Sequence, residues 1–362
     1  MTRLSEELLA IRPLDAEAMA AAQAHLDRLT KPPGSLGRLE ELVVWLAGVT
    51  GQVKSSVDRR AVVVAAADHG VALARDVSAY PSDVTAQMVA NFLHGGAAIS
   101  VLARAARAEV VVIDAGVATQ IPATDPAPGV RHINGHGPAG TGDMMSGPAM
   151  TPAEVTNAIG VGIDTAQDLI AHECQVILVG EMGIGNTTAA SAIVSAITGR
   201  PVRHVTGRGT GIDDAGWERK VAAIEHALDV NQPTPNDPLD VLRRVGGLEV
   251  ATLVGVIAGA AARRVPVLLD GFITGAAALI VCELQPLLAP RLLASHRSAE
   301  PGHAIILERL GLRPLLEMDM RLGEGTGATL AMLVLDAAVR VRDEMATFDS
   351  AGVAQRAAVT AR

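Results

Sequence analysis

The chain has 362 residues, of which 49% are hydrophobic but only 2% aromatic, and it carries a formal net charge of −9. A core of Ala, Val, Leu and Ile favours parallel strands wrapped by helices. This length allows one large α/β unit, or one large and one small domain. The negative charge is spread along the chain, which argues against non-specific nucleic-acid binding and against binding to an anionic membrane surface.

Neither a secretory leader nor a membrane span is expected. The first nine residues carry Glu6 and Glu7 and no apolar centre. The longest mainly apolar run, 265–282, is interrupted by Pro266 and by an Asp-Gly pair, which indicates a strand, a turn and a buried helix. The two cysteines lie in or next to apolar runs without metal-ligand spacing, so we expect buried thiols in a reducing compartment, the cytoplasm.

The N-terminal third begins with helical periodicity over 4–29, interrupted near Pro13. The turn-rich segment 31–37 follows as a plausible domain boundary, and 39–49 is expected to be a helix. A buried strand is predicted at 60–67, ending in Asp68-His69-Gly70. Ligands gather at the carboxyl ends of parallel strands, so these polar residues are noted, although caps on a loop would look the same.

Helices are predicted at 84–93 and 97–107, and a strand at 110–113. A long loop rich in Gly and Pro then runs from about residue 122 to residue 148, which suggests a functional or flexible segment. It contains His132 and His136. They could be metal ligands, but no third partner has a helpful spacing, so a solvated loop is the better interpretation.

A capping box with Pro at the first helical position, Thr151-Pro-Ala-Glu154, predicts a helix. After it, a glycine-rich stretch at 180–188 lies between a buried strand at 175–179 and a helix at 189–197. Such a turn can hold a phosphate, because backbone N–H groups and the helix dipole favour negative charge. Its spacing fits a P-loop except that Asn186 replaces the lysine, so ATP or GTP hydrolysis is not expected. A tight turn that binds nothing is the alternative, at even odds.

A second glycine-rich loop, 207–211, follows an apolar stretch at 202–205 that favours a short strand. Asp213 or Asp214 is expected to cap a helix that carries Lys220. By itself, that lysine would be interpreted as a solvated helix residue.

The C-terminal third contains a helix at 248–262 and strands at 266–269 and 292–294. The first of these strands ends in Asp270, and the second in the polar segment 295–303. The last helix is amphipathic. Its predicted buried stripe consists of Leu330, Leu333, Val334, Ala337, Ala338 and Val341.

The repeated order of strand, polar or glycine-rich loop, and helix predicts a doubly wound, mainly parallel, Rossmann-like α/β sheet with its site along the strand ends. The first and last helices fall outside this order and are expected to form a small helical domain. The predicted boundaries are 31–304 for the large α/β domain, and 1–30 with 305–362 for the small one.

Glu324 is the carboxylate that stands out, because glycines flank it on both sides and let the chain approach a ligand. Apolar residues precede it, among them Leu322, and desolvation there would raise the pKa of the carboxyl and make it a better base. A surface glutamate beside a helix start is the alternative interpretation. Glu181 has the same two interpretations, because it lies inside the predicted phosphate turn.

Seven sets of residues share an order along nearly the whole chain: 31–37, 80–81 with 84–89 and 91–92, 180–188, 209–211, 269–272, 295–303 and 320–327. Together they resemble the nicotinate-nucleotide–dimethylbenzimidazole phosphoribosyltransferases of cobalamin nucleotide-loop assembly. The resemblance implies transfer of phosphoribose from nicotinate mononucleotide to 5,6-dimethylbenzimidazole, with inversion at C1′. It also implies a homodimer of a large α/β and a small helical domain.

The resemblance also implies roles for particular residues. Glu324 matches the general base, and Glu181 and Lys220 match a second pair of charged catalytic residues. Tyr80 and Gln87 fall where the family lines its benzimidazole pocket. The remaining expected substrate-binding residues are Gly183, Gly185, Asn186, Thr187, Thr188, Gly209, Thr210, Gly211, Asp270 and Leu322.

This chemistry needs neither metal nor cofactor, and none is expected: the pyridinium leaves as a neutral ring, and the azole needs one base. A nucleotide hydrolase would need the missing P-loop lysine. A dinucleotide-dependent oxidoreductase would need G-x-G-x-x-G after the first strand, where Asp68-His69-Gly70 stands instead. A non-catalytic nucleotide-binding protein would keep the loops without needing Glu324, and a turnover assay separates it from the enzyme.

Overall fold

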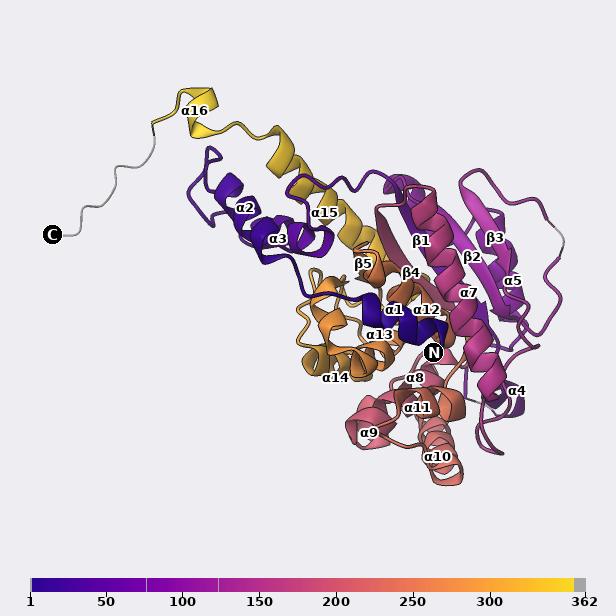
Figure 1. The fold of residues 1–362 in the computed structure, drawn as a ribbon. Helices are drawn as coiled ribbons and strands as arrows, with labels where there is room; N and C mark the ends of the chain where they lie inside the picture. The colour runs from indigo at the N-terminus through magenta and orange to yellow at the C-terminus, as the bar shows by residue number, and fades with distance from the viewer. Residues whose placement is uncertain (1, 76, 123, 355–362) are drawn as a thin grey trace. The chain divides into compact units, whose positions relative to one another are not determined.

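The computed structural model describes residues 2–75, 77–122 and 124–354 (Figure 1). The chain divides into two compact units, an α/β unit of residues 1–12 and 58–332 and a helical unit of residues 13–57 and 333–362. The predicted boundaries differ from this division. Residues 1–12 and 305–332 belong to the α/β unit, and residues 31–57 belong to the helical one.

The α/β unit is built on a six-stranded sheet among the residues described, with the strand order β3-β2-β1-β4-β5-β6 and every neighbouring pair parallel. This is the order of a Rossmann sheet, in which ligands bind where the order reverses, here between β1 and β4. The doubly wound α/β fold is therefore confirmed. The strands are β1 Arg60–Ala67, β2 Glu109–Gly116, β3 Val130–Asn134, β4 Val176–Met182, β5 Val267–Leu269 and β6 Leu292–Ala294.

Helices form most of the connections between the strands and pack around the sheet (Figure 1). Those of the α/β unit are α1 Arg3–Ala10, α4 Gly70–Ala74, α5 Val84–Leu93, α6 Ala98–Ala105, α7 Pro152–Ala171, α8 Asn186–Thr198, α9 Val202–Val205, α10 Asp214–Asn231, α11 Pro238–Val245, α12 Leu248–Ala262, α13 Phe272–Leu284, the 3-10 helix η1 Pro286–Arg291 and α14 Pro301–Leu310. Helix α15, Thr326–Glu344, begins in this unit and continues into the helical one.

The central strands are covered on both faces, which explains their uninterrupted apolar sequences. All eight residues of β1 are buried. Side chains alternate between the faces of a strand, and Val63 and Ala65 join the core cluster that contains α7 and α12, whereas Val62 contacts the loop before α15 on the other face. Helices α7 and α12 pack backbone against backbone: a Cβ on Gly162 would lie 1.9 Å from the carbonyl oxygen of Thr252.

The helical unit contains α2 Ala16–Leu26, α3 Arg38–Thr50, the end of α15 and α16 Phe348–Ala351. Backbone hydrogen bonds join its two chain segments, from Thr30 to Ala346 and from Phe348 to Arg28. The predicted linker 31–37 is an ordered turn of this unit. The carboxylate of Glu40 pairs with buried Lys31 at 2.8 Å and accepts the N–H groups of Gly34 and Leu36, so the chain does not change domain there.

Three local predictions are wrong for identifiable reasons. Residues 202–205 form helix α9 rather than a strand, because Val202 and Val205 are three apart and share the buried face of one helical turn. The predicted loop 122–148 contains strand β3, an edge strand whose sequence has only two strongly apolar residues and whose residues are all partly or fully exposed. Strand β4 extends to Met182, so Gly180 and Glu181 belong to the strand and not to the turn.

The buried face of α15 also differs from the prediction, since Leu333 is 41% exposed and Ala337 is exposed as well. Arg342 is buried instead, and its guanidinium donates to the carbonyl oxygens of Val53 and Ser55. A charged residue with backbone partners thus occupies a position that an apolar stripe does not reveal. The buried residues of the helix include Ala328, Ala331, Met332, Leu335, Ala338 and Val339.

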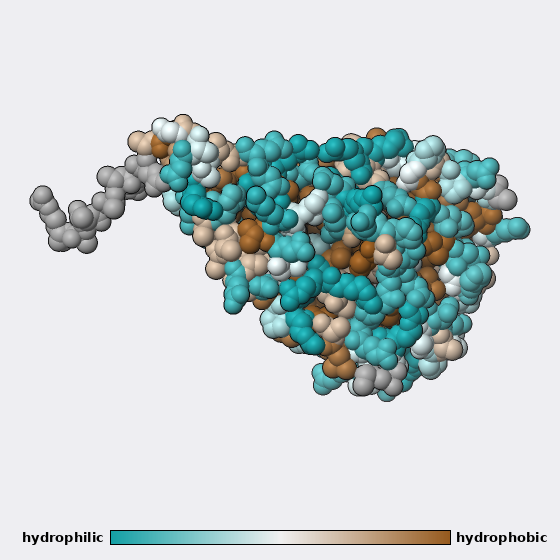
Figure 2. Space-filling view, turned by 45° about the horizontal axis from the view of Figure 1, so that its top comes forward, coloured by the Kyte–Doolittle hydropathy of each residue, from teal (hydrophilic) through white to brown (hydrophobic). Residues whose placement is uncertain are grey.

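Within the described ranges, one segment is apolar and long enough to be compared with a membrane span, Val84–Ala105, and 44% of it is buried inside the fold. It consists of the two helices α5 and α6, with a glycine pair between them. On the face drawn in Figure 2, apolar residues lie in small patches among hydrophilic ones. This segment is therefore a pair of core helices of the α/β unit.

Candidate active site

A cavity of about 620 Å³ lies at the carboxyl ends of β4, β5 and β6. Eight of the predicted site residues line it together, from four separate segments of the α/β unit. They are Tyr80, Glu181, Gly183, Asn186, Thr187, Gly209, Thr210 and Leu322. The expectation that the site lies along the strand ends is met by this arrangement.

The turn after β4 places the start of α8 at the cavity. Gly185 is the N-cap residue, with φ +100°, and no side chain that the structure describes caps this helix start. The N–H groups of Asn186 and Thr188 are bonded within the turn, to the carbonyl oxygens of Gly183 and Gly185. The N–H of Thr187 has no such partner among the described residues, so Thr187 offers both its N–H and its hydroxyl to a ligand.

Lys220 lies beside Thr187 and is not a solvated lysine. It is 1% exposed, and its Nζ donates to Thr187 Oγ1 at 2.7 Å. Burial lowers the pKa of the ammonium to about 8, and the negative charge of Glu300 opposes this lowering. The carboxylate that acts on Lys220 is therefore Glu300, and not Glu181 as the predicted pairing implied.

Glu181 forms part of the cavity floor, although it is only 4% exposed. The side-chain amide of Asn186 donates to its Oε2. Burial raises the pKa of Glu181 well above its ordinary value, and the charges of Asp270, Glu249 and Glu324 raise it further. Burial therefore favours the protonated form of Glu181, which can donate a hydrogen bond as well as accept one.

Glu324 is buried, 4% exposed, which excludes the surface-glutamate interpretation. Its backbone has φ +64° between two left-handed glycines. The chain passes so close to β4 that a Cβ on Gly180 would lie 2.4 Å from the Glu324 carbonyl carbon. The carboxylate accepts the N–H of Ile99 at the start of α6, at 3.3 Å. Glu324 itself does not line the cavity, although its neighbours Leu322 and Gly323 do.

The electrostatics of Glu324 match the predicted direction. Burial raises the pKa of its carboxyl, the charge of Asp270 adds to this rise, and the hydrogen bond from Ile99 opposes it. Among the contacts that the structure describes, only Oε2 is engaged, so Oε1 can accept a further proton donor.

Asp270 lies at the end of β5, but its carboxylate is hydrogen-bonded to the protein backbone and does not line the cavity. It is 1% exposed, and its two oxygens accept the N–H groups of Gly325, Gly327 and Ala328 at 2.7–3.1 Å. Asp270 therefore caps the start of α15 and holds the loop that carries Glu324.

The remaining predicted site residues do not line this cavity. Gln87 is exposed on α5, and Thr188 is fully buried beneath the turn. Gly185 packs against Ala72, which leaves no space for a side chain. Gly211 lines a neighbouring cavity of about 700 Å³ on the other side of the glycine-rich loop.

Several cavity residues were not singled out in the sequence. They come from segments 295–303 and 320–327, and from the start of α13: Phe272, His296, Ser298, Glu300 and Arg321. The polar segment after β6 is the signal that could have found three of them, because it follows a strand end of the same sheet.

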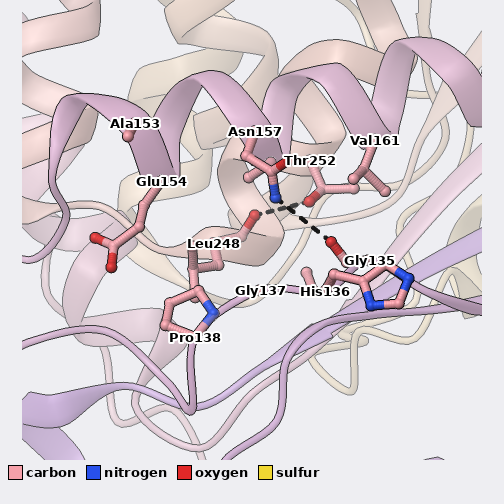
Figure 3. Close-up of a pocket in the computed structure, with 12 residues that line it drawn as sticks. Gly135, His136, Gly137, Pro138, Ala153, Glu154, Asn157, Val161, Leu248 and Thr252 are labelled. Carbon is pink, nitrogen blue, oxygen red and sulfur yellow. Dashed lines mark hydrogen bonds between the residues drawn. The ribbon is translucent and has the colours of Figure 1, made fainter.

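A separate cavity of about 380 Å³ lies at the ends of β2 and β3, against α7 and α12 (Figure 3). His136 borders it, and the side-chain amide of Asn157 donates to the Gly135 carbonyl oxygen at 3.5 Å. His132 lies in β3. No group of three or more His, Cys, Asp or Glu side chains in the described part of the chain is arranged to hold a metal.

Asp68 and His69 lie at the end of β1. The ring of His69 packs against Gly183 and Gly185 in the turn after β4. His69 Nε2 is hydrogen-bonded to Glu249 Oε1 at 2.9 Å, and both side chains are buried. Asp68 accepts the N–H of Ala118 at 2.8 Å. Neither Asp68 nor His69 lines the 620 Å³ cavity, and both side chains are buried.

The sheet order and the cavity at its strand ends define a doubly wound α/β protein with a ligand site beyond the carboxyl ends of its strands. The chain belongs to the phosphoribosyltransferase family, whose family model matches residues 11–353. It is therefore an enzyme of this transferase class, and the family resemblance found in the sequence is confirmed.

Individual relatives agree with this assignment. The chain is 56% identical over 353 residues to a nicotinate-nucleotide–dimethylbenzimidazole phosphoribosyltransferase of Roseiflexus sp. (strain RS-1), covering 98% of each chain. It is 55% identical over 356 residues to one of Chloroflexus aggregans, covering 98% of this chain and 99% of the other. A crystal structure of such an enzyme from Thermus thermophilus matches with a TM-score of 0.86 and 46% identity, over 95% of this chain and 100% of the other.

Proposed function

We propose that this chain transfers the phosphoribosyl group of nicotinate mononucleotide to 5,6-dimethylbenzimidazole, giving α-ribazole 5′-phosphate and nicotinate. One observation carries the proposal: a single cavity joins a glycine-bordered helix start, beside a buried lysine, to the buried carboxyl of Glu181. The names of the relatives at 55–56% identity support the same two substrates.

The phosphate end of the cavity is assigned to Thr187, Gly209 and Lys220. A Cβ placed on Gly209 would lie 2.8 Å from Thr187 Oγ1 and 3.2 Å from Lys220 Nζ, so only glycine leaves this space open. The three groups supply a hydroxyl, backbone and an ammonium, which suits one phosphate monoester. No lysine at position 186 is needed, because no γ-phosphate is to be reached.

Glu181 and Asn186 are assigned to the ribose. They lie on the cavity floor between the phosphate end and the ends of β5 and β6. In the protonated form, which burial favours, the Glu181 carboxyl can donate to one hydroxyl oxygen and accept from a second hydroxyl. We expect this pair to fix the sugar so that C1′ faces the incoming azole.

Glu324 is assigned as the general base. One azole nitrogen attacks C1′, the bond from C1′ to the pyridinium nitrogen breaks, and its electron pair stays on nicotinate as a neutral ring nitrogen. The proton on the other azole nitrogen passes to Glu324. Attack opposite the leaving group converts the β-linkage into an α-linkage. A neutral leaving group needs no Lewis acid, so we propose catalysis without metal or cofactor.

We further propose that the enzyme works as a homodimer in the cytoplasm and requires neither membrane nor nucleic acid. The net charge of −9 and the family resemblance support this proposal.

Product analysis tests the proposed function. The purified protein is mixed with nicotinate mononucleotide and 5,6-dimethylbenzimidazole, and the products are separated and weighed by mass spectrometry. Equal amounts of nicotinate and α-ribazole 5′-phosphate are expected. Binding of the mononucleotide without turnover would instead indicate a non-catalytic nucleotide-binding protein.

A further inference from the structure

Glu300 occupies the boundary between two cavities of the α/β unit. It is the N-cap residue of α14, is 6% exposed, and borders both the 620 Å³ cavity and the neighbouring 700 Å³ cavity. Its Oε1 accepts the N–H of Gly209 at 2.9 Å, across the glycine-rich loop. A carboxylate at this place is unexpected, because the proposed ligand group there is an anion.

The second oxygen of Glu300 faces the same loop. A Cβ on Gly207 would lie 2.0 Å from Oε2, so a side chain at this position would displace the carboxylate. Oε2 has no hydrogen-bond partner among the described residues, although it is buried. A buried carboxylate without a full set of donors is costly unless a cation lies nearby.

Lys220 is that cation. The groups that face it are the Thr187 hydroxyl from α8, the Gly209 turn and Glu300, and Glu300 is the charged group among them that acts on the ammonium. The carboxylate thus binds the turn through one oxygen and attracts the lysine through its charge.

We propose that Glu300 is a positioning residue for the phosphate end of the cavity: it holds the Gly209 turn and keeps Lys220 charged for the phosphate. The inference rests on the proposed function, because it needs a phosphate at Lys220. It gives the carboxylate a function there: its negative charge opposes the loss of the proton from Lys220.

The two roles separate in Glu300→Gln, which keeps an oxygen for the Gly209 N–H but removes the charge. Without the carboxylate, burial acts on Lys220 unopposed, and the ammonium loses its proton at a lower pH. The repulsion removed from the phosphate does not depend on the ionisation of Lys220. The quantity to follow is the KM of the variant for nicotinate mononucleotide, divided by that of the wild type. Any change of this ratio with pH therefore reports the ionisation of Lys220 alone.

The experiment measures this ratio from about pH 6.5 to about pH 9 at saturating 5,6-dimethylbenzimidazole. If losing one neighbouring charge lowers the pKa of Lys220 by about one unit, the ratio should rise from about 1 to about ninefold across this range. The value of kcat should change little at low pH, because the reacting groups are untouched.

Three further variants make the test decisive. Glu218→Gln is the control: Glu218 borders the neighbouring cavity, pairs with Arg203 and is 55% exposed, so its ratio should stay flat. Glu300→Asp keeps the charge and should show a much smaller rise than Glu300→Gln. In a Lys220→Met background, Glu300→Gln should give no pH-dependent ratio. Thermal unfolding verifies that each variant is folded.

A flat ratio for Glu300→Gln, or an equal rise for Glu300→Asp, would overturn the inference while leaving the proposed function intact. Failure of the wild type to turn over the two substrates would instead reject the proposed function. If Glu300→Gln does not fold, Glu300→Asp decides alone, and a rise as large as ninefold contradicts the role of charge.

Discussion

Lys220→Met is expected to make the protein more stable and a weaker enzyme at the same time. Lys220 is 1% exposed, and burial lowers the pKa of its ammonium from an ordinary value of 10.5 to about 8. A lowering of this size means that keeping the buried group charged at neutral pH costs about 3 kcal/mol of folding free energy. Methionine has a similar length and carries no such cost.

The pH dependence follows from the same pKa values. Between pH 8 and pH 10.5 the unfolded wild-type chain binds more protons than the folded one, so the stability of the wild type rises with pH across this window. The methionine variant has no such rise. At neutral pH the variant should gain up to about 3 kcal/mol in the free energy of unfolding, from which the loss of the hydrogen bond to Thr187 takes about 1 kcal/mol. This gain should shrink towards pH 10.5.

Binding should change in the opposite direction. A hydrogen bond from a charged donor is worth about 1.5–3 kcal/mol, which corresponds to a rise in KM for nicotinate mononucleotide of roughly 10- to 150-fold. Urea unfolding at several pH values and steady-state kinetics measure the two effects, and Lys54→Met, at an exposed lysine, is the matched control. A variant that is less stable than the wild type at neutral pH, or whose KM is unchanged, would refute this account.

Three other outcomes are expected. Glu324→Gln should lower kcat by ~10²–10⁴-fold. The ionised carboxylate is the proposed base and its pKa is raised, so the kcat of the wild type should fall as pH drops through that pKa. The variant should lack this acidic limb of the pH profile. A near-normal kcat with the wild-type pH profile would exclude Glu324 as the base. EDTA should leave turnover unchanged, and loss restored by Mg²⁺ would contradict the neutral-leaving-group argument. Serine at Cys174 and Cys282 should leave kcat nearly unchanged, since both thiols are buried and neither forms a disulfide. Cys174 also precedes the amino end of β4, whereas the cavity lies at the carboxyl end. A large fall in kcat without unfolding would contradict this expectation.

The strands that the sequence predicts well are those buried on both faces. Residues 60–67 form β1 as expected, because an uninterrupted apolar run has few other places in an α/β fold. Strand β3 was missed because an edge strand exposes much of its length and needs no such run. The helix at 202–205 was missed because four residues are too short a stretch for periodicity to separate a helical turn from a short strand.

For the site, the sequence identifies loops better than it identifies side-chain directions. Gly183, Asn186 and Thr187 follow a strand end directly, and they line the cavity as predicted. Asp270 also follows a strand end, but the N–H groups at the start of α15 capture it, and that helix lies far along the chain. Lys220 looks like a solvated lysine because its burial depends on Thr187 and Glu300, contacts that a linear pattern does not contain.

The same dependence on distant helix starts explains how several carboxylates share one site. Glu181, Asp270 and Glu324 lie close enough for their charges to affect one another. Asp270 is stabilised by three N–H groups at the start of α15, and Glu324 by the N–H of Ile99 at the start of α6. Glu181 lines the cavity. Burial and the charges of Asp270, Glu249 and Glu324 raise its pKa well above the ordinary value, although a backbone hydrogen bond from Glu324 opposes this rise. The N–H groups at these helix starts therefore stabilise negative charge on Asp270 and Glu324, whereas burial favours the protonated form of Glu181. This difference suits the proposed roles, in which Glu181 donates a hydrogen bond to the sugar and Glu324 takes a proton from the azole.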